Sequence, residues 1–423
     1  MSGLKWKLAI LMIVCIFTGS IVFYFLGVRS KHSIDLRGGN RRISYEGDST
    51  IKASKPGCLI GDLKNSLVYW SGRNVDTELR LTTGNWSSSN SYLQTSCTPN
   101  KHIVFVKIPK TGSTTVASVF LRYGFRNDLK VVLPATQNTL LRLKQSEYDI
   151  MRDEYDKNPH YDIMTHHSKY DRKAVEKLMP LDSVYVVMLR EPVSRFKSAF
   201  NYFRVSKKFG IQGKNQLKTY LSTPKFYNSK QSGLLFNAMI NYLGYSTATT
   251  SVQNFINEID RDFDYVLIME YTDEGLVMLK RRFCWDIGDV IYLKIHEVKR
   301  KNYQELIKGN TDPEIPEKLR KFSEEDFLLY DYFRRKFENI LHKQNADFFE
   351  EVQFLREVNR KIAAFCSSKS DTTLDIVPCR WTRGFTIHKP YCKLMMIANR
   401  PFSVLLKSSY FKGIFNDIIL PKV

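Results

Sequence analysis

The chain has 423 residues, 43% of them hydrophobic, which is typical of a globular protein with a large core and excludes a disordered one. Its formal net charge of +21 favours anionic partners. Nucleic acid is disfavoured, because the basic residues are spread among many acidic ones and no zinc-finger or RNP-like motif accompanies them.

The N-terminal segment predicts a membrane anchor. Residues 1–7 are short and basic, and residues 8–28 form an uncharged run long enough to span a bilayer. A cleaved signal peptide is the alternative, but the apolar run is long and no clear Ala-x-Ala site follows it. We therefore expect a cytoplasmic tail over 1–7, a transmembrane signal anchor over 8–28, a polar stem over 29–57 and a luminal domain over 58–423.

Two further features agree with the secretory pathway. Asn85, in Asn85-Trp86-Ser87, is an N-glycosylation acceptor. Cys15 lies in the predicted span, and the remaining six cysteines form an even set. An even set allows disulfides in an oxidising compartment, although the sequence does not choose their pairing.

The compact part of the chain starts with a strand–turn–helix unit. Residues 103–106 are an apolar, β-branched run typical of a buried strand, Pro109 and Gly112 mark a turn, and apolar residues at helical spacing follow up to Gly124. A helix N-terminus offers unpaired N–H groups and a positive dipole end, so this turn predicts a phosphate site. The turn adds Lys107, Lys110, Thr111, Ser113, Thr114 and Thr115. The alternative is an ordinary turn with solvated lysines.

Further strands are predicted at residues 161–165, 183–189, 264–269 and 290–293, with helices between them. This alternation predicts an α/β fold, a P-loop-like three-layer sandwich with a mainly parallel central sheet. A long charged helical region is expected over 323–365, followed by an irregular basic C-terminal region.

A second candidate element follows the strand at 183–189. Arg190 stands at the carboxyl end of this strand, and Ser198 lies about two turns into the next helix. Ligands of open α/β sheets bind outside the carboxyl ends of strands, so we expect Arg190 to reach the same ligand as Lys110. The planar fork of arginine suits a second phosphate. Arg195 is expected at the surface.

The two elements resemble the 5′-phosphosulfate and 3′-phosphate loops of sulfotransferases that use 3′-phosphoadenosine 5′-phosphosulfate (PAPS). Several longer stretches resemble the galactose-3-O-sulfotransferases, Golgi type II membrane enzymes that sulfate the 3-hydroxyl of galactose on glycolipids or glycans. These stretches cover residues 97–125, 186–203, 236–245, 268–294 and 348–366.

The resemblance implies PAPS as co-substrate, no metal, and a galactose-terminated glycolipid or glycan as acceptor. It places Lys107, Lys110, Thr111, Gly112, Ser113, Thr114 and Thr115 around the 5′-phosphosulfate. Arg190 and Ser198 would hold the 3′-phosphate, and Lys110 would stabilise charge on the transferring group. It also implies a Golgi membrane protein with one N-terminal helix and no nucleic-acid partner; a homo-oligomer is compatible with the sequence.

A base must take the proton of the acceptor hydroxyl. His166 and His167 follow the predicted strand at 161–165, and the resemblance favours His166 as this base. Glu270, just after the predicted strand at 264–269, is the second candidate, as a base or as a carboxylate that binds the acceptor. Surface histidines that merely end a strand are the alternative.

The acceptor stays open between two sugars. Members of the family often carry histidine where this chain has Pro109. The Pro-Lys-Thr-Gly-Ser version also occurs in uronyl 2-O-sulfotransferases. A membrane-anchored glycan-binding protein without transferase activity is a different class that also fits these residues. A nucleotide kinase is disfavoured, because the Gly-x4-Gly-Lys-Ser/Thr pattern is absent.

Overall fold

In the computed structural model, the chain is described over residues 97–133, 160–224, 232–293, 313–369 and 372–397. The predicted tail, signal anchor and stem and the Asn85 acceptor lie outside these ranges. Among the described residues, no helix combines the length and the apolar character needed to cross a membrane.

A five-stranded sheet forms the centre of the fold, in the order β2-β3-β1-β4-β5, and every neighbouring pair is parallel. The predicted α/β class with a parallel sheet is thereby confirmed. The strands are β1 (Ile103–Val106), β2 (Val131–Val132), β3 (Ile163–Met164), β4 (Val184–Leu189) and β5 (Tyr265–Ile268). All four residues of β1 are buried, as the apolar run predicted.

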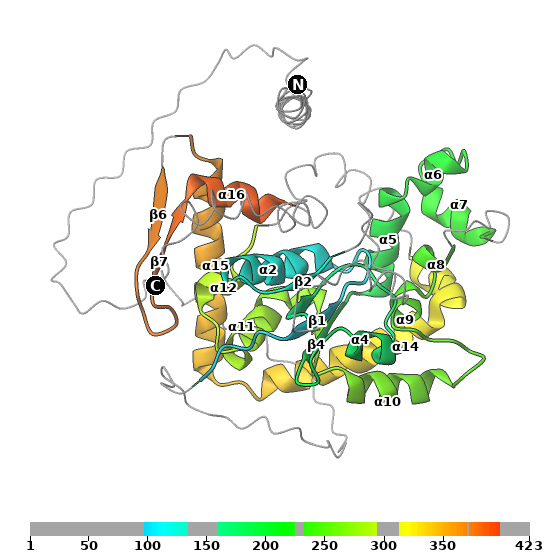
Figure 1. Cartoon of the computed structure of the whole chain (residues 1–423). Coiled ribbons are helices and arrows are strands. Elements are labelled where there is room, and N and C mark those ends of the chain that lie inside the picture. The colour runs from blue at the N-terminus through cyan, green and yellow to red at the C-terminus, as the bar shows by residue number, and fades with distance from the viewer. Residues whose placement is uncertain (1–96, 134–159, 225–231, 294–312, 370–371, 398–423) are drawn as a thin grey trace, which may run out of the picture. The chain divides into compact units, whose positions relative to one another are not determined.

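Helices cover both faces of this sheet (Figure 1). On one face Phe120 packs edge-on against Phe105 of β1 and lies beside Phe283 and Trp285. This side carries α2 (Ser113–Arg126), α11 (Thr272–Arg282) and α12 (Ile287–Val290), with α15 (Ala346–Ser367) and α16 (Lys389–Met396) outside them. The other side carries α4 (Arg172–Glu176), α10 (Val252–Asp262) and α14 (Glu314–His342).

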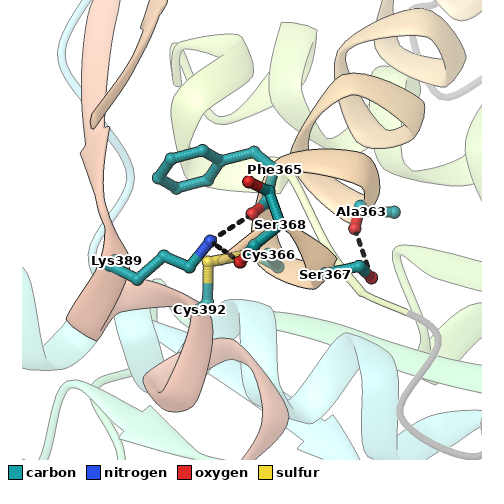
Figure 2. The surroundings of a disulfide bond; sticks show 7 residues. All are labelled: Ala363, Phe365, Cys366, Ser367, Ser368, Lys389 and Cys392. Carbon is teal, nitrogen blue, oxygen red and sulfur yellow. Dashed lines mark hydrogen bonds between the residues drawn. A yellow bond between two sulfur atoms is a disulfide. The ribbon is translucent and has the colours of Figure 1, made fainter. Parts of the chain in front are cut away.

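The C-terminal part of the described chain is more regular than the sequence predicts. Strands β6 (Thr373–Ile376) and β7 (Phe385–His388) form an antiparallel pair that leads into α16. A disulfide joins Cys366 near the end of α15 to Cys392 of α16, and Lys389 donates to the carbonyls of Phe365 and Ser368 at the end of α15 (Figure 2). A cation at a helix C-terminus satisfies otherwise unpaired carbonyls, so this contact reinforces the disulfide.

Three sequence predictions differ from the structure. The strand expected at 290–293 is absent: Val290 ends the short helix α12, whose first turn is closed by a reciprocal capping box between Asp286 and Asp289. The helical region expected over 323–365 is two helices, α14 and α15, separated by a break at which Asn345 caps α15. The third difference concerns Arg195, which is buried.

A second disulfide, Cys97–Cys284, ties the start of the described chain to the residue that follows Phe283.

A group of short helices extends one end of the fold. They are α5 (Pro192–Tyr202), α6 (Val205–Lys208), α7 (Gln216–Ser222), α8 (Ser232–Leu235) and α9 (Ala238–Tyr242). Side chains of the first four helices form a second apolar cluster with the first part of α14, including Phe196, Phe200, Tyr220 and Leu235, while Met239 and Ile240 of the last helix belong to the main cluster. The second cluster fixes α5, which starts two residues after Arg190.

A buried ion pair sits between α5 and α14. Arg195, expected at the surface, is only 1% exposed, and its Nε lies 3.8 Å from Oδ2 of the equally buried Asp326. The Arg195 guanidinium also donates to the carbonyls of Leu234 and Leu235. Burial lowers the pKa of Arg195 and raises the pKa of Asp326, so each charge depends on the other and on its hydrogen bonds.

Asp326 connects this pair to the backbone beside the candidate site. Its carboxylate accepts hydrogen bonds from the N–H groups of Met239 (3.2 Å) and Ile240 (2.9 Å) in α9. The sulfur of Met239 in turn accepts the N–H of Arg190 at 3.5 Å. The ion pair therefore fixes the segment against which Arg190 rests.

We predict that Asp326→Ala lowers the free energy of unfolding by about 3–5 kcal/mol, because it leaves the Arg195 charge buried without its partner. Glu317→Ala, which removes an exposed ion pair with Lys321 on the same helix, should cost about 0–1 kcal/mol. Urea unfolding of the full chain measures both. Equal losses in the two variants would contradict the assigned role of Asp326.

Candidate active site

The turn between β1 and α2 has a sharply bent backbone. Lys110 and Gly112 both adopt the left-handed conformation, with φ of 68° and 81°. A Cβ on Gly112 would lie 3.0 Å from Cγ of Met269, so both the conformation and the space require glycine. Met269 follows β5, and this contact joins the turn to the end of a second strand.

Two of the predicted hydroxyl ligands shape the turn itself. Thr111 and Ser113 are buried, and both donate their hydroxyl hydrogen to the carbonyl of Ile108, at 3.1 and 2.6 Å. Thr114 and Thr115 are partly exposed in the first turn of α2. This helix begins without a capping side chain and without an acidic residue in its first turn, so its positive end stays available to an anion.

Lys107 and His167 form a closed pair beside this turn. Nδ1 of His167 lies 2.8 Å from the carbonyl oxygen of Lys107, and Nε2 lies 2.8 Å from the Lys107 ammonium. Because a carbonyl only accepts, Nδ1 carries the hydrogen and Nε2 accepts from Lys107. The imidazole is therefore neutral, with its basic nitrogen directed at a cation.

Burial and neighbouring positive charge shift the pKa values of this pair. Burial, followed by the charge of Lys107, lowers the pKa of His167 to about 3. Burial, followed by the charge of Lys110, lowers the pKa of Lys107 to about 7. Lysine and histidine are both shifted towards their neutral forms, as expected where positive groups crowd together away from water.

Lys110 and Arg190 meet at the same edge of the sheet. Nη1 of Arg190 donates to the carbonyl of Lys110 at 3.0 Å. Burial and the charge of Arg190 lower the pKa of Lys110 to about 8. The Lys110 ammonium lies 3.8 Å from the centroid of the Tyr202 ring, at the end of α5. The two predicted phosphate-binding elements therefore open onto one place, 80 residues apart in sequence.

Helix α5 places Ser198 in this neighbourhood. Ser198 precedes Tyr202 by one turn, and residues four apart lie on the same helix face. The N-terminus of α5 is occupied, because Glu191 accepts the N–H groups of Val193 and Ser194. A phosphate near α5 would thus meet Arg190 and the face carrying Ser198, rather than the helix end.

The predicted bases occupy distinct positions. His166 is 2% exposed, and its neighbour His167 is the histidine that contacts Lys107. Glu270 is exposed at the end of β5, where its carboxylate accepts from the N–H of Glu191 and from the hydroxyl of Tyr330. It therefore braces α5 and α14 across the site.

Among the described residues, no group of three His, Cys, Asp or Glu side chains is arranged to hold a metal ion. The arrangement combines three cationic side chains, an uncapped helix N-terminus and a neutral imidazole. Such a site can bind a ligand with two phosphate-type groups and place a proton acceptor beside one of them.

Sequence reasoning overlooked the supports of the site. Asp326 lies in a charged stretch of α14 that reads as a solvated face, and its partner Arg195 is 131 positions earlier. No local signal distinguishes it. Asn237 is a second support that the sequence analysis overlooked. It precedes α9 with a left-handed backbone, φ of 46°. Its side-chain amide donates to the Glu325 carboxylate and accepts the N–H of Asp326.

The known proteins to which this chain is similar are all sulfotransferases. A family model described as Galactose-3-O-sulfotransferase matches residues 63–380. Galactosylceramide sulfotransferase of Homo sapiens is 29% identical over 283 residues, covering 64% of this chain and 65% of the relative. Galactose-3-O-sulfotransferase 2 of Mus musculus is 28% identical over 284 residues, covering 63% and 70%. Galactose-3-O-sulfotransferase 3 of Mus musculus is 28% identical over 281 residues, covering 62% and 63%. The matched region thus spans about two thirds of the length of these relatives.

Proposed function

Because this chain belongs to the galactose-3-O-sulfotransferase family, we propose that it transfers sulfate from PAPS to a carbohydrate hydroxyl, the 3-hydroxyl of a terminal galactose on a glycolipid or glycan. The observation that carries the proposal is the meeting of Lys107, Lys110 and Arg190 at one sheet edge. A nucleotide with a 5′-phosphosulfate and a 3′-phosphate presents two anionic groups for these cations.

The residues of the turn suit the phosphosulfate end. Lys107, Lys110 and the N–H groups at the start of α2 would stabilise negative charge on the transferring sulfuryl group and on the leaving phosphate. Arg190 and Ser198 would bind the 3′-phosphate, and the buried Arg195–Asp326 pair would hold their backbone in place.

The transfer itself forms one bond and breaks one. The acceptor oxygen bonds to sulfur while the bond from sulfur to the bridging oxygen of the 5′-phosphate breaks, leaving adenosine 3′,5′-bisphosphate. The hydroxyl proton passes to a base. We favour His167 for this role, because its Nε2 lone pair faces the ammonium of Lys107 in the turn that would hold the phosphosulfate, whereas the sequence-based prediction was His166.

We also propose that residues 8–28 anchor the protein in the Golgi membrane, with 29–57 as stem and 58–423 in the lumen. The support is the uncharged run at 8–28, the Asn85 acceptor and the Cys97–Cys284 and Cys366–Cys392 disulfides. Digestion of the luminal domain by protease added to sealed Golgi vesicles would contradict this orientation.

The first test is transfer itself. We expect the full chain to move radiolabelled sulfate from PAPS to galactosylceramide or lactosyl glycans in preference to desulfated heparan or dermatan. Lys110→Ala should reduce transfer by at least about 100-fold, since it removes charge stabilisation in the transition state. Lys177→Ala, which replaces an exposed lysine at the opposite end of the sheet, is the control.

Preference for uronic acid acceptors would favour the uronyl 2-O-sulfotransferase alternative, and PAPS binding without transfer to any sugar would favour a glycan-binding protein.

Donor binding should weaken as pH rises from 7 to 9. Lys107 and Lys110, with pKa values near 7 and 8, lose their protons over this range in the free site, whereas a bound polyanion favours the charged lysines. A phosphate monoester is already dianionic there, its second pKa being about 6. Affinity for adenosine 3′,5′-bisphosphate should therefore fall by up to about tenfold per pH unit for each proton taken up. Calorimetry in buffers of different ionisation enthalpy measures this uptake. Lys110→Arg should reduce it, and an affinity that stays constant or rises with pH would refute the role of both lysines.

The two histidines can be separated by matched substitutions. We expect His167→Asn, which preserves a donor near the Lys107 carbonyl but has no base, to lower kcat by about 10²–10⁴. His166→Asn should change folding stability more than kcat per folded molecule, because this side chain is buried. Initial rates combined with thermal unfolding distinguish the outcomes. The reverse pattern would restore His166 as the base.

A further inference from the structure

Tyr202 is an exposed aromatic ring beside the candidate site. Among the Phe, Tyr and Trp residues that the structure describes, only Tyr202 and Phe349 are exposed, with 65% and 42% of their surface accessible to solvent. Tyr202 ends α5, and it lies outside both apolar clusters of the fold. Its ring therefore contributes little to the core, so packing does not explain why an aromatic residue stands at this position.

The orientation of this ring is fixed by two neighbours. Phe203, partly buried against the second apolar cluster, packs edge-on against it, with centroids 5.2 Å apart and planes at 81°. The Lys110 ammonium lies over the ring at 3.8 Å from its centroid. One face of the ring is thus directed towards the lysine of the turn, and the ring is held there without being buried.

This cation–π contact belongs to the resting site. A cation–π contact on an exposed ring is weak, and a lysine paired with phosphate or sulfate is held more strongly. An anionic donor would therefore draw the Lys110 ammonium away from the ring. The ring is then left with an open face next to the group that Lys110 stabilises.

We propose that the Tyr202 ring is the platform for the acceptor sugar, which stacks its apolar face on the aromatic ring; this inference rests on the proposed function. A β-galactose has one face on which several C–H groups point the same way, because its 4-hydroxyl is axial. Aromatic rings bind such apolar faces while leaving the hydroxyls free to react or to hydrogen-bond. A sugar on this ring lies beside Lys110, which serves the transferring end of the donor, whereas the nucleoside lies towards Arg190 and Ser198.

The test compares Tyr202→Ala, Tyr202→Phe and Tyr202→Trp in the full chain. With PAPS saturating, Tyr202→Ala should raise the KM for a β-galactoside acceptor about tenfold, the loss expected for one aromatic contact of about 1.4 kcal/mol. The KM for PAPS should change less than about twofold. Tyr202→Phe and Tyr202→Trp should retain acceptor binding, because each keeps an aromatic face. Phe349→Ala, the exposed aromatic of α15 that packs edge-on against Phe348, is the matched control.

Three outcomes would overturn the inference: an unchanged acceptor KM in Tyr202→Ala, a rise in the KM for PAPS alone, or a fall in kcat with both KM values unchanged. The second would make the ring a nucleotide platform, and the third a support for Lys110. Saturation-transfer NMR with methyl β-galactoside and adenosine 3′,5′-bisphosphate provides a readout independent of turnover. If wild type transfers no sulfate but its galactoside signal is lost in Tyr202→Ala, the proposed function fails while the platform stands. Equal signals in wild type and Tyr202→Ala would refute the platform.

Discussion

The register of β1 between β3 and β4 is the constraint on which the candidate site depends. Ile103 pairs with Ile163 on one side and with Val184 on the other, so the three strands run in parallel and reach the same edge. The residue after β1 then meets His167, and the turn that follows meets Arg190. A slip of one residue would reverse the side-chain faces of a strand and separate these pairs. The site is thus a consequence of strand pairing, which the buried apolar runs determine.

The electrostatics of the site follow from bringing these cations together. Burial, followed by the repulsion of neighbouring positive charge, lowers the pKa values of Lys107 and Lys110, so holding these cations together costs free energy. A ligand with several negative charges relieves this repulsion, while a neutral ligand does not. Glu270 is the nearby carboxylate at the end of β5, and its oxygens are engaged by the N–H of Glu191 and the hydroxyl of Tyr330. This edge is therefore suited to polyanions, in line with the proposed doubly phosphorylated nucleotide.

Sequence patterns predicted the parts of the protein that depend on local signals. The apolar run before Lys107 and the glycine at position 112 sufficed for the strand–turn–helix unit, and the run before Arg190 sufficed for its partner. What the patterns could not supply depends on distant residues. Arg195 appears solvated in sequence because its partner Asp326 lies in another helix, and residues 290–293 have strand-like composition although a capping box made by Asp286 and Asp289 starts a helix there. The hydrogen bonds between Lys107 and His167, on which our proposal of His167 as the base rests, likewise join residues 60 positions apart.

The two lysines of the turn share a feature that bears on the order of binding. In the structure, the Lys107 ammonium donates a hydrogen bond to the basic nitrogen of His167, and the Lys110 ammonium lies over the face of the Tyr202 ring. Under the proposed function, these are the groups that the acceptor needs: a lone pair for its proton and a surface for its sugar ring. A charge-assisted bond to phosphate or sulfate is stronger than a contact with a neutral imidazole or an aromatic ring, so the donor attracts both ammonium groups. Donor binding would therefore free both Nε2 of His167 and the face of Tyr202. It would neutralise the Lys107 charge, the smaller cause of the lowered His167 pKa, while burial, the larger cause, would remain. Under the proposed function, an acceptor that arrived first would meet a blocked base and a covered ring, which favours a donor-first sequence.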